Sequence, residues 1–312
     1  MRICLFIFFL LFEGMCSAQG QHSNDPYIIV LGIAQDAGYP QAGCLEDCCK
    51  RAWNDPSQKR LVASLALVDP ATKNWWLFDA TPDITEQLQL FRKITHSEYA
   101  VLPKAVFLTH GHIGHYTGLM YFGREVMNTS GLTVYAMPRM QSFLQNNGPW
   151  SQLVQLKNIS ISSLANDKTV SLAPGIDVTP FLVPHRDEFT ETVGFTITHK
   201  DFKLIFIPDI DKWDKWDRSI NTVVKNSSIA LLDGTFFSDK ELKGRSMSEI
   251  PHPFVQESFT QFEGLTAVEK KKIIFIHLNH TNPLLDPSSK AYTETSSKGF
   301  SVAKQGQKIE MK

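Results

Sequence analysis

The segment His110-Gly111-His112-Ile113-Gly114-His115 constrains this chain more than any other feature. Its three imidazoles follow the apolar run 105–108, which predicts a strand. Packing does not require this density of histidines, whereas metal binding does, because neutral imidazole is a common ligand of zinc and related ions. Side chains at i and i+2 of an extended segment point the same way, so His110 and His112 can bind one ion together. A chance cluster of surface histidines is the alternative.

The N-terminus has the layout of a secretory signal. Arg2 precedes the apolar run Ile3 to Phe12, and the small-residue site Cys16-Ser17-Ala18 follows. The run is shorter than the ~20 residues of a membrane-spanning helix. We expect residues 1–18 to be a signal peptide, cleaved after Ala18, and 19–312 to form a single domain that is periplasmic or secreted. A lipoprotein anchor at Cys16 is the alternative.

The composition narrows the range of partners. The net charge is -1, and the basic residues are scattered rather than gathered into a patch. This argues against nucleic-acid binding and favours a small-molecule substrate. After the leader we expect no stable membrane insertion, since no other segment is long and apolar enough. A homodimer is a possibility that the sequence leaves open. The tail after Ser288 is polar, and we expect it to be peripheral.

Strands dominate the expected elements, and helices lie between them, a pattern typical of a layered α/β fold. Strands are expected at 27–31, 61–68, 75–78, 105–108, 132–136, 176–183, 193–198, 203–207, 229–232 and 273–276. Helices are expected at 83–91, with Thr81 as cap and Pro82 in the first position, and at 116–124, 138–145 and 254–262.

Three further residues of metal-binding type sit at the ends of apolar strands: His185, Asp209 and His277. Taken singly, each has an ordinary interpretation as a satisfied polar residue or a turn cap. Their common location favours one shared site with the histidine motif. Cys44, Cys48 and Cys49 share one short loop, and their odd number argues against a simple disulfide framework. Free thiols, one disulfide from Cys44, or part of a metal site remain open.

The order His-x-His-x-x-His, distant His, Asp after a strand and final His resembles the metallo-β-lactamase superfamily, over nearly the whole chain after the leader. The resemblance implies an α/β fold of the αββα sandwich type, two mixed sheets flanked by helices, with a metal site at one edge. It also implies the ligands. His110, His112 and His185 would hold a first ion, His115 and His277 a second, and Asp209 would bridge them.

One position departs from the family pattern. The motif usually reads His-x-His-x-Asp-His, and here Gly114 replaces the aspartate that binds the second ion. His115, Asp209 and His277 still make an open three-ligand site. A weak site, a mononuclear site and a site suited to another ion all remain open. We expect one or two zinc ions here, with iron or manganese as the alternatives. Asp36 is a candidate replacement, although a loop-capping role for it is favoured.

The cysteines resemble those of the branch that contains the cyclic-phosphate phosphodiesterase of phosphonate breakdown. That likeness implies a structural zinc on Cys44, Cys48, Cys49 and His280, although the Cys-x-x-x-Cys-Cys spacing here differs from the usual one. The stretches 31–41, 232–235 and 281–284 resemble the B proteins of pyrroloquinoline-quinone biosynthesis.

These observations favour an exported metal-dependent hydrolase that acts on a phosphodiester, including cyclic phosphates, or an ester. A metal would activate water as the nucleophile, and Asp209 would orient the ions or the water. His252 is a candidate proton donor, although a surface-loop histidine is the favoured interpretation. Asp233 either orients a metal-binding histidine or occupies a turn. An iron-dependent oxidative enzyme and a non-catalytic binding protein, the latter suggested by Gly114, are the alternatives.

Overall fold

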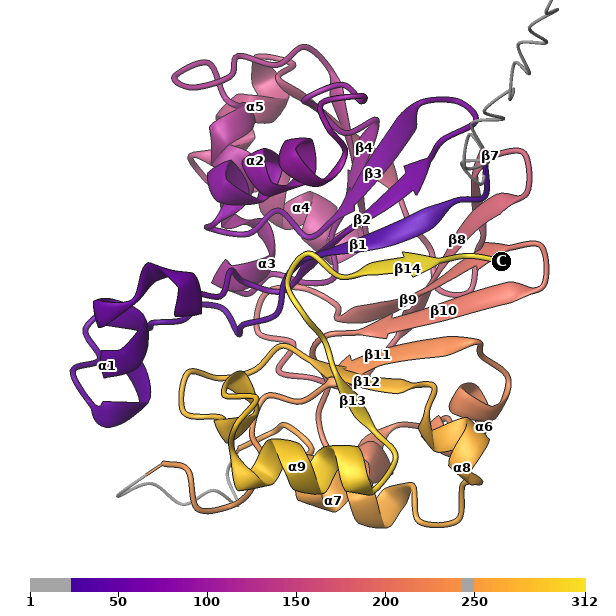
Figure 1. The fold of residues 1–312 in the computed structure, drawn as a ribbon. Coiled ribbons are helices and arrows are strands. Elements are labelled where there is room, and N and C mark those ends of the chain that lie inside the picture. Colours follow the sequence, from indigo (N-terminus) through magenta and orange to yellow (C-terminus); the bar gives the residue numbers. More distant parts are fainter. Residues whose placement is uncertain (1–23, 243–249) are drawn as a thin grey trace, which may run out of the picture.

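The computed structural model describes residues 24–242 and 250–312, so the expected leader, 1–18, lies outside the described residues. Two seven-stranded sheets face each other in this part of the chain (Figure 1). The first sheet has the order β14 (Lys308–Glu310), β1 (Tyr27–Gly32), β2 (Ser64–Asp69), β3 (Asn74–Phe78), β4 (Ala105–Phe107), β5 (Leu132–Ala136), β6 (Ile159–Ser163). The second has the order β13 (Ser301–Val302), β12 (Ile273–Ile276), β11 (Ile229–Asp233), β10 (Phe202–Ile207), β9 (Val193–His199), β8 (Ile176–Leu182), β7 (Val170–Ala173).

Helices cover the outer faces of both sheets and complete the expected αββα arrangement (Figure 1). On the first sheet lie α2 (Ile84–Ile94), α4 (Pro138–Asn146) and α5 (Trp150–Gln155). On the second lie α6 (Ile220–Lys225), α7 (Val255–Gln261), α8 (Ala267–Lys270) and α9 (Lys290–Ser297). The helix α1 (Asp47–Asn54) projects from the body, and α3 (Ile113–Tyr116) follows β4.

The period-two alternation of strand side chains gives the first sheet two buried faces. In β1, Ile28 and Val30 pack between the sheets, whereas Ile29 and Leu31 pack against the helices of the first sheet. Both sets are buried, which is why β1 is an uninterrupted apolar run in the sequence. Across the sandwich, the ring of Phe78 lies 5.4 Å from that of Phe195, measured between centroids. The packed sheets give a rigid base for the loops at their edges.

The direction of the strands brings several chain segments to one edge. β3 and β4 are parallel, and so are β10, β11 and β12. β8 pairs antiparallel with β9, which pairs antiparallel with β10, so β8 and β10 also run in the same direction. The carboxyl ends within each set therefore lie on the same side of their sheet, the usual place for a ligand site in sheets of this kind.

Three expectations about elements are wrong. The tail after Ser288 is not peripheral: α9 packs on the second sheet, β13 pairs with β12, and β14 pairs with β1. The helix expected to have Thr81 as its cap has Asp83 as its N-cap residue instead. Thr81 lies in a turn before the helix, where its hydroxyl accepts a hydrogen bond from the Asp83 amide. The stretch 116–124 is mainly a 3-10 helix, Thr117–Phe122. Among the described residues, no helix is long and apolar enough to cross a membrane.

Candidate metal centre

Six residues expected to bind metal lie together at the carboxyl edge of the strands. His110 follows β4, His185 follows β8, Asp209 follows β10, and His277 follows β12 directly. The short helix α3 brings His115 back toward His110, with ring centroids 4.1 Å apart. The sixth residue, His112, lies just before α3, with its ring centroid 5.0 Å from that of His185.

Asp209 lies at the centre of this cluster. Its Oδ2 atom is 3.3 Å from His110 Nε2, and its Oδ1 atom is 3.3 Å from His185 Nε2. Oδ2 also lies 3.8 Å from His115 Nε2 and 4.0 Å from His277 Nε2. One carboxylate therefore faces both the first and the second expected group of ligands, which is the position of a bridging residue.

The inward-facing atoms of the cluster lack hydrogen-bond partners. Nε2 of His110, His115, His185 and His277 and Nδ1 of His112 are all buried and have no hydrogen-bond partner. A buried polar atom without a partner costs about 1–3 kcal/mol. Several such atoms converging on one place need a common partner, and imidazole nitrogens with a carboxylate oxygen form a normal donor set for a divalent cation. The residues therefore fit a metal ion.

The charge of the cluster also fits a cation. The side chains of Asp79, Asp209 and Asp233 are almost completely buried. Burial raises the pKa of Asp209 to about 7, against the influence of His252. Burial also lowers the pKa of His277 to about 3, which keeps that imidazole neutral and able to bind metal. Buried carboxylates need a compensating positive charge, and a divalent ion supplies it.

Asp79 and Thr109 orient two of the histidines from the first sheet. Asp79 Oδ2 accepts the Nδ1 proton of His115 at 2.7 Å. The Thr109 hydroxyl donates a hydrogen bond to the same carboxylate at 2.9 Å. Its oxygen lies 3.0 Å from His110 Nδ1 and can accept a hydrogen bond from that nitrogen. With Nδ1 occupied in both rings, Nε2 is left free to bind metal.

Asp233 and Thr235 form a matching pair on the second sheet. The Thr235 hydroxyl donates to Asp233 at 2.7 Å and lies 2.9 Å from His277 Nδ1. Sequence reasoning considered Asp233 for this role but did not identify Asp79 or the two threonines. The signal was present, since Asp79 directly follows the buried strand β3 and Asp233 is the last residue of the buried strand β11.

His252 is buried beside the cluster, so the favoured interpretation as a surface-loop histidine is wrong. Its Nδ1 lies 2.9 Å from Asp233 Oδ2 and 3.1 Å from Asp209 Oδ1. Burial opposes the charged form, but the two carboxylates outweigh it and raise the pKa of His252 to about 9. The imidazole is therefore protonated at neutral pH and can donate a proton.

Two groups lie next to the histidines. Asp36 Oδ1 is 3.4 Å from His115 Nε2 and has no hydrogen-bond partner, so this atom does not cap the loop. Glu188 Oε2 lies 3.2 Å from His112 Nε2, which leaves Nδ1 as the inward atom of that ring.

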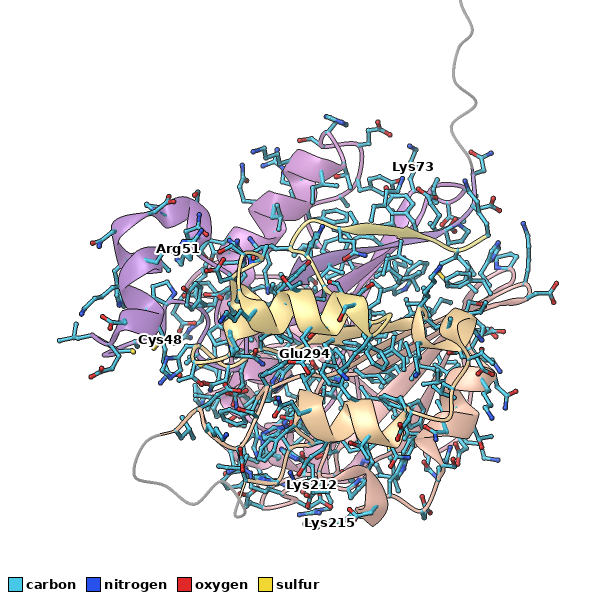
Figure 2. All side chains as sticks on the ribbon, turned by 60° about the horizontal axis from the view of Figure 1, so that its bottom comes forward. Cys48, Arg51, Lys73, Lys212, Lys215 and Glu294 are labelled. Carbon is cyan, nitrogen blue, oxygen red and sulfur yellow. The ribbon has the colours of Figure 1, made fainter. Side chains whose placement is uncertain are left out.

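The three cysteines meet His280 at the base of α1, where Figure 2 labels Cys48. His280 Nδ1 lies 3.4 Å from Cys49 Sγ and 3.6 Å from Cys48 Sγ. Cys44 Sγ is 3.6 Å from Cys48 Sγ, and all three cysteines are free. Three thiols and one imidazole at these separations match the donor set of a structural zinc site. Whether zinc binds there stays a prediction.

Comparison with known proteins agrees with this geometry. A family model described as beta-lactamase superfamily domain matches residues 74–278. The chain belongs to this superfamily. The match spans the strands that carry the histidine cluster, from β3 to β12.

Individual relatives of this superfamily member cover almost its whole length. A coenzyme PQQ synthesis protein B from Xanthomonas euvesicatoria pv. vesicatoria is 28% identical over 310 residues, with 90% of this chain and 99% of the relative covered. The Zn²⁺-bound PqqB from Methylobacterium extorquens superposes with a TM-score of 0.73 at 23% identity, covering 91% of this chain and 99% of the other. A diphosphatase of the PhnP family has a TM-score of 0.63 at 20% identity, covering 91% and 96%. These structures confirm the expected fold.

Replacing Asp79 with asparagine tests the orienting role. The amide cannot hold the His115 and Thr109 protons as the carboxylate does, so metal affinity should fall by roughly 10–100-fold. Competition with a chelating dye measures it. Asp69→Asn is the matched control, since Asp69 is also buried but bonds only to a turn at the other end of β2. An equal loss in both variants would mean that Asp79 acts through general stability alone.

Proposed function

We propose that this protein is a metal-dependent hydrolase that cleaves a phosphodiester, with cyclic phosphates included. The proposal depends on one observation above all, the set of unpaired imidazole nitrogens that surround Asp209 beside the buried His252. His110, His112 and His185 would hold the ion with Asp209, and His115 and His277 would face a second ion. A metal bound there supplies activation of water and polarisation of the phosphoryl oxygen.

Residues around the metal site would contribute positioning, proton transfer and substrate contact. Asp209 lies 3.3 Å from both His110 and His185 and would fix the relative positions of these two ligands. His252 holds a proton at neutral pH and is suited to deliver it to the leaving oxygen. The exposed Phe189 follows Glu188, which contacts His112, and offers an apolar surface near the centre for the organic part of a substrate.

Two lines support the choice of a phosphoryl substrate. The PhnP-family diphosphatase and the yeast PDE1 resemble this chain in fold, with TM-scores of 0.63 and 0.62. The cysteine cluster also resembles that of the cyclic-phosphate phosphodiesterase branch. An ester is the next candidate, because activated water attacks acyl carbon by the same chemistry.

A cofactor-biosynthesis role is the second candidate. Relatives at 28% identity are coenzyme PQQ synthesis proteins B, and the alignment covers 99% of their length. Imidazole and carboxylate ligands also suit iron, so oxygen-dependent oxidation is compatible with the same cluster. Similar folds support different chemistry, and the metal must therefore be measured.

Element-resolved metal analysis, on protein purified without chelator or nickel, is the test. Two or three zinc ions per chain, with hydrolysis of bis-p-nitrophenyl phosphate or a 2′,3′-cyclic nucleotide, would support the hydrolase. One zinc together with iron would favour the oxidative enzyme, and oxygen consumption in the presence of candidate substrates would follow. Protein that binds metal only through its cysteines would contradict both.

A further inference from the structure

Position 114 lacks the aspartate of the family motif, and the carboxylate of Asp36, from another part of the chain, lies beside it. A Cβ atom built on Gly114 would lie only 2.2 Å from Asp36 Oδ1 and 2.5 Å from Asp36 Cα. Real Cβ atoms essentially never approach another heavy atom this closely. The Asp36 side chain therefore occupies the volume into which a side chain at position 114 would extend, and the two positions exclude each other.

The carboxylate of Asp36 is directed at the two histidines of the second group. The ligand atoms of Asp36, His115 and His277 all lie within 4.8 Å of one another. Asp36 Oδ1, His115 Nε2 and His277 Nε2 are buried, and each lacks a hydrogen-bond partner. Three unpaired ligand atoms that converge in this way need a shared partner, and their types are those of an N, N, O metal site.

The loop that carries Asp36 is fixed to the segment that carries His277. The Gln35 amide donates to the Leu278 carbonyl at 2.8 Å, and the Leu278 amide donates to the Ile33 carbonyl at 2.8 Å. Asp36 and His277 thus belong to two neighbouring segments joined by backbone hydrogen bonds. His277 also has a positive φ of 64°, an uncommon conformation for a residue other than glycine, which the surrounding bonds hold in place.

We infer that Asp36 supplies, from the loop after β1, the carboxylate that the histidine motif lacks at Gly114, and that it completes a second divalent-metal site with His115 and His277. Asp209 lies 3.8 Å from His115 Nε2 and is the fourth side chain of this site. The absence of a side chain at Gly114 then provides the space that Asp36 occupies, and it does not indicate that the second metal site has been lost. The inference rests on the proposed metal centre and adds a ligand to it.

Removing the carboxylate is the first arm of the test. Metal-free full-length protein is titrated with Zn²⁺ in a calorimeter, and bound zinc is counted by elemental analysis. Asp36→Asn and Asp36→Ala should each lose the second ion of the centre, or bind it more weakly by more than the roughly 100-fold that loss of an outer hydrogen-bond partner costs. The control is Glu46→Gln, an exposed carboxylate further along the same loop. It should behave as the unchanged protein.

Moving the carboxylate is the second arm. In Asp36→Gly combined with Gly114→Asp, the carboxylate returns to the motif and the Asp36 side chain is gone. The Cα atom of residue 36, 2.5 Å from the new Cβ, must still move, and glycine gives the loop the freedom to do so. This double variant should recover most of the second-site affinity that Asp36→Gly alone loses. Gly114→Asp alone should lose it, because its side chain collides with Asp36.

The outcomes separate this inference from the proposed function. Co²⁺ spectra report thiolate ligation separately, so the cysteine site is counted apart from the centre. If the unchanged protein binds no ion outside the cysteines, the proposed function itself fails. If the unchanged protein binds two ions at the centre, and the Asp36→Asn and Asp36→Ala variants bind both ions with the same affinity, the inference fails and the proposed hydrolase function remains. If the double variant melts at the same temperature as Asp36→Gly, so that the loop has accommodated the new side chain, but binds the second ion no more tightly, the inference is also overturned. Melting of the metal-free variants shows whether each is folded.

Discussion

A His185→Ala variant is expected to lose hydrolytic activity by at least about 1000-fold, because a metal ion supplies several kcal/mol of transition-state stabilisation and each 1.36 kcal/mol is a factor of ten in rate. His185 faces Asp209 at 3.3 Å, and its side chain is fully buried. Its removal leaves the first ion with two imidazoles. His112→Ala should act in the same way. Elemental analysis and kcat/KM with a phosphodiester, measured on the same preparation, check both effects.

His199→Ala is the matched control for this prediction. His199 is also buried, but it lies at the end of β9, where Nδ1 is 3.0 Å from the Gly175 carbonyl. Loss of this imidazole should leave metal content and kcat/KM near those of the unchanged protein. Full metal content in both His185→Ala and His112→Ala would contradict the assignment of the ligands. Equal losses in all three variants would point to general destabilisation.

The fold and the convergence of most candidate ligands could be predicted because the signals are local. Buried strands on both faces give continuous apolar runs, and a polar residue directly after such a run marks the edge where strands end. His110, His185, Asp209 and His277 all have this signature. In the second sheet β8, β10 and β12 run in the same direction, which places the last three at one edge. The packing of the two sheets brings His110, after β4 of the first sheet, to the same place. The expected family then gave the arrangement of the two sheets.

The remaining features depend on contacts between distant segments. The sequence made Asp36 and His252 candidates but favoured a loop role for both. Their contacts appear only when the loop after β1 and the segment before α7 lie against α3 and β11. Each residue lies in a polar stretch that is typical of a surface loop. The C-terminal tail was misjudged for a similar reason, since β14 is short and half polar and becomes a strand only through pairing with β1.

The Cys49→Ser variant should lose the metal held by the cysteines and melt at a lower temperature by roughly 10 °C. The estimate assumes an ion at about 1000 times its Kd, which contributes about 4 kcal/mol, and a shift of about 2–4 °C per kcal/mol for a domain of this class. The physical reason is the position of the site. Cys49 lies in the first turn of α1, which projects from the body, and His280 follows β12. One ion would therefore tie the N-terminal loop to the second sheet (Figure 1).

Comparison with and without a chelator isolates the metal contribution, since serine in a buried position has a cost of its own. Lys50→Ser, in the next position of α1 and exposed, is the control and should melt as the unchanged protein does. His280→Ala should lower the melting temperature in the same way, because it removes the ligand from the other side of the site. The double variant with Cys49→Ser should lose less stability than the sum of the two single variants, because either change already removes the ion. A strong chelator should bring the unchanged protein close to the variants. If the chelator leaves the difference between the unchanged protein and Cys49→Ser intact, the thiols stabilise the loop by packing and hold no metal.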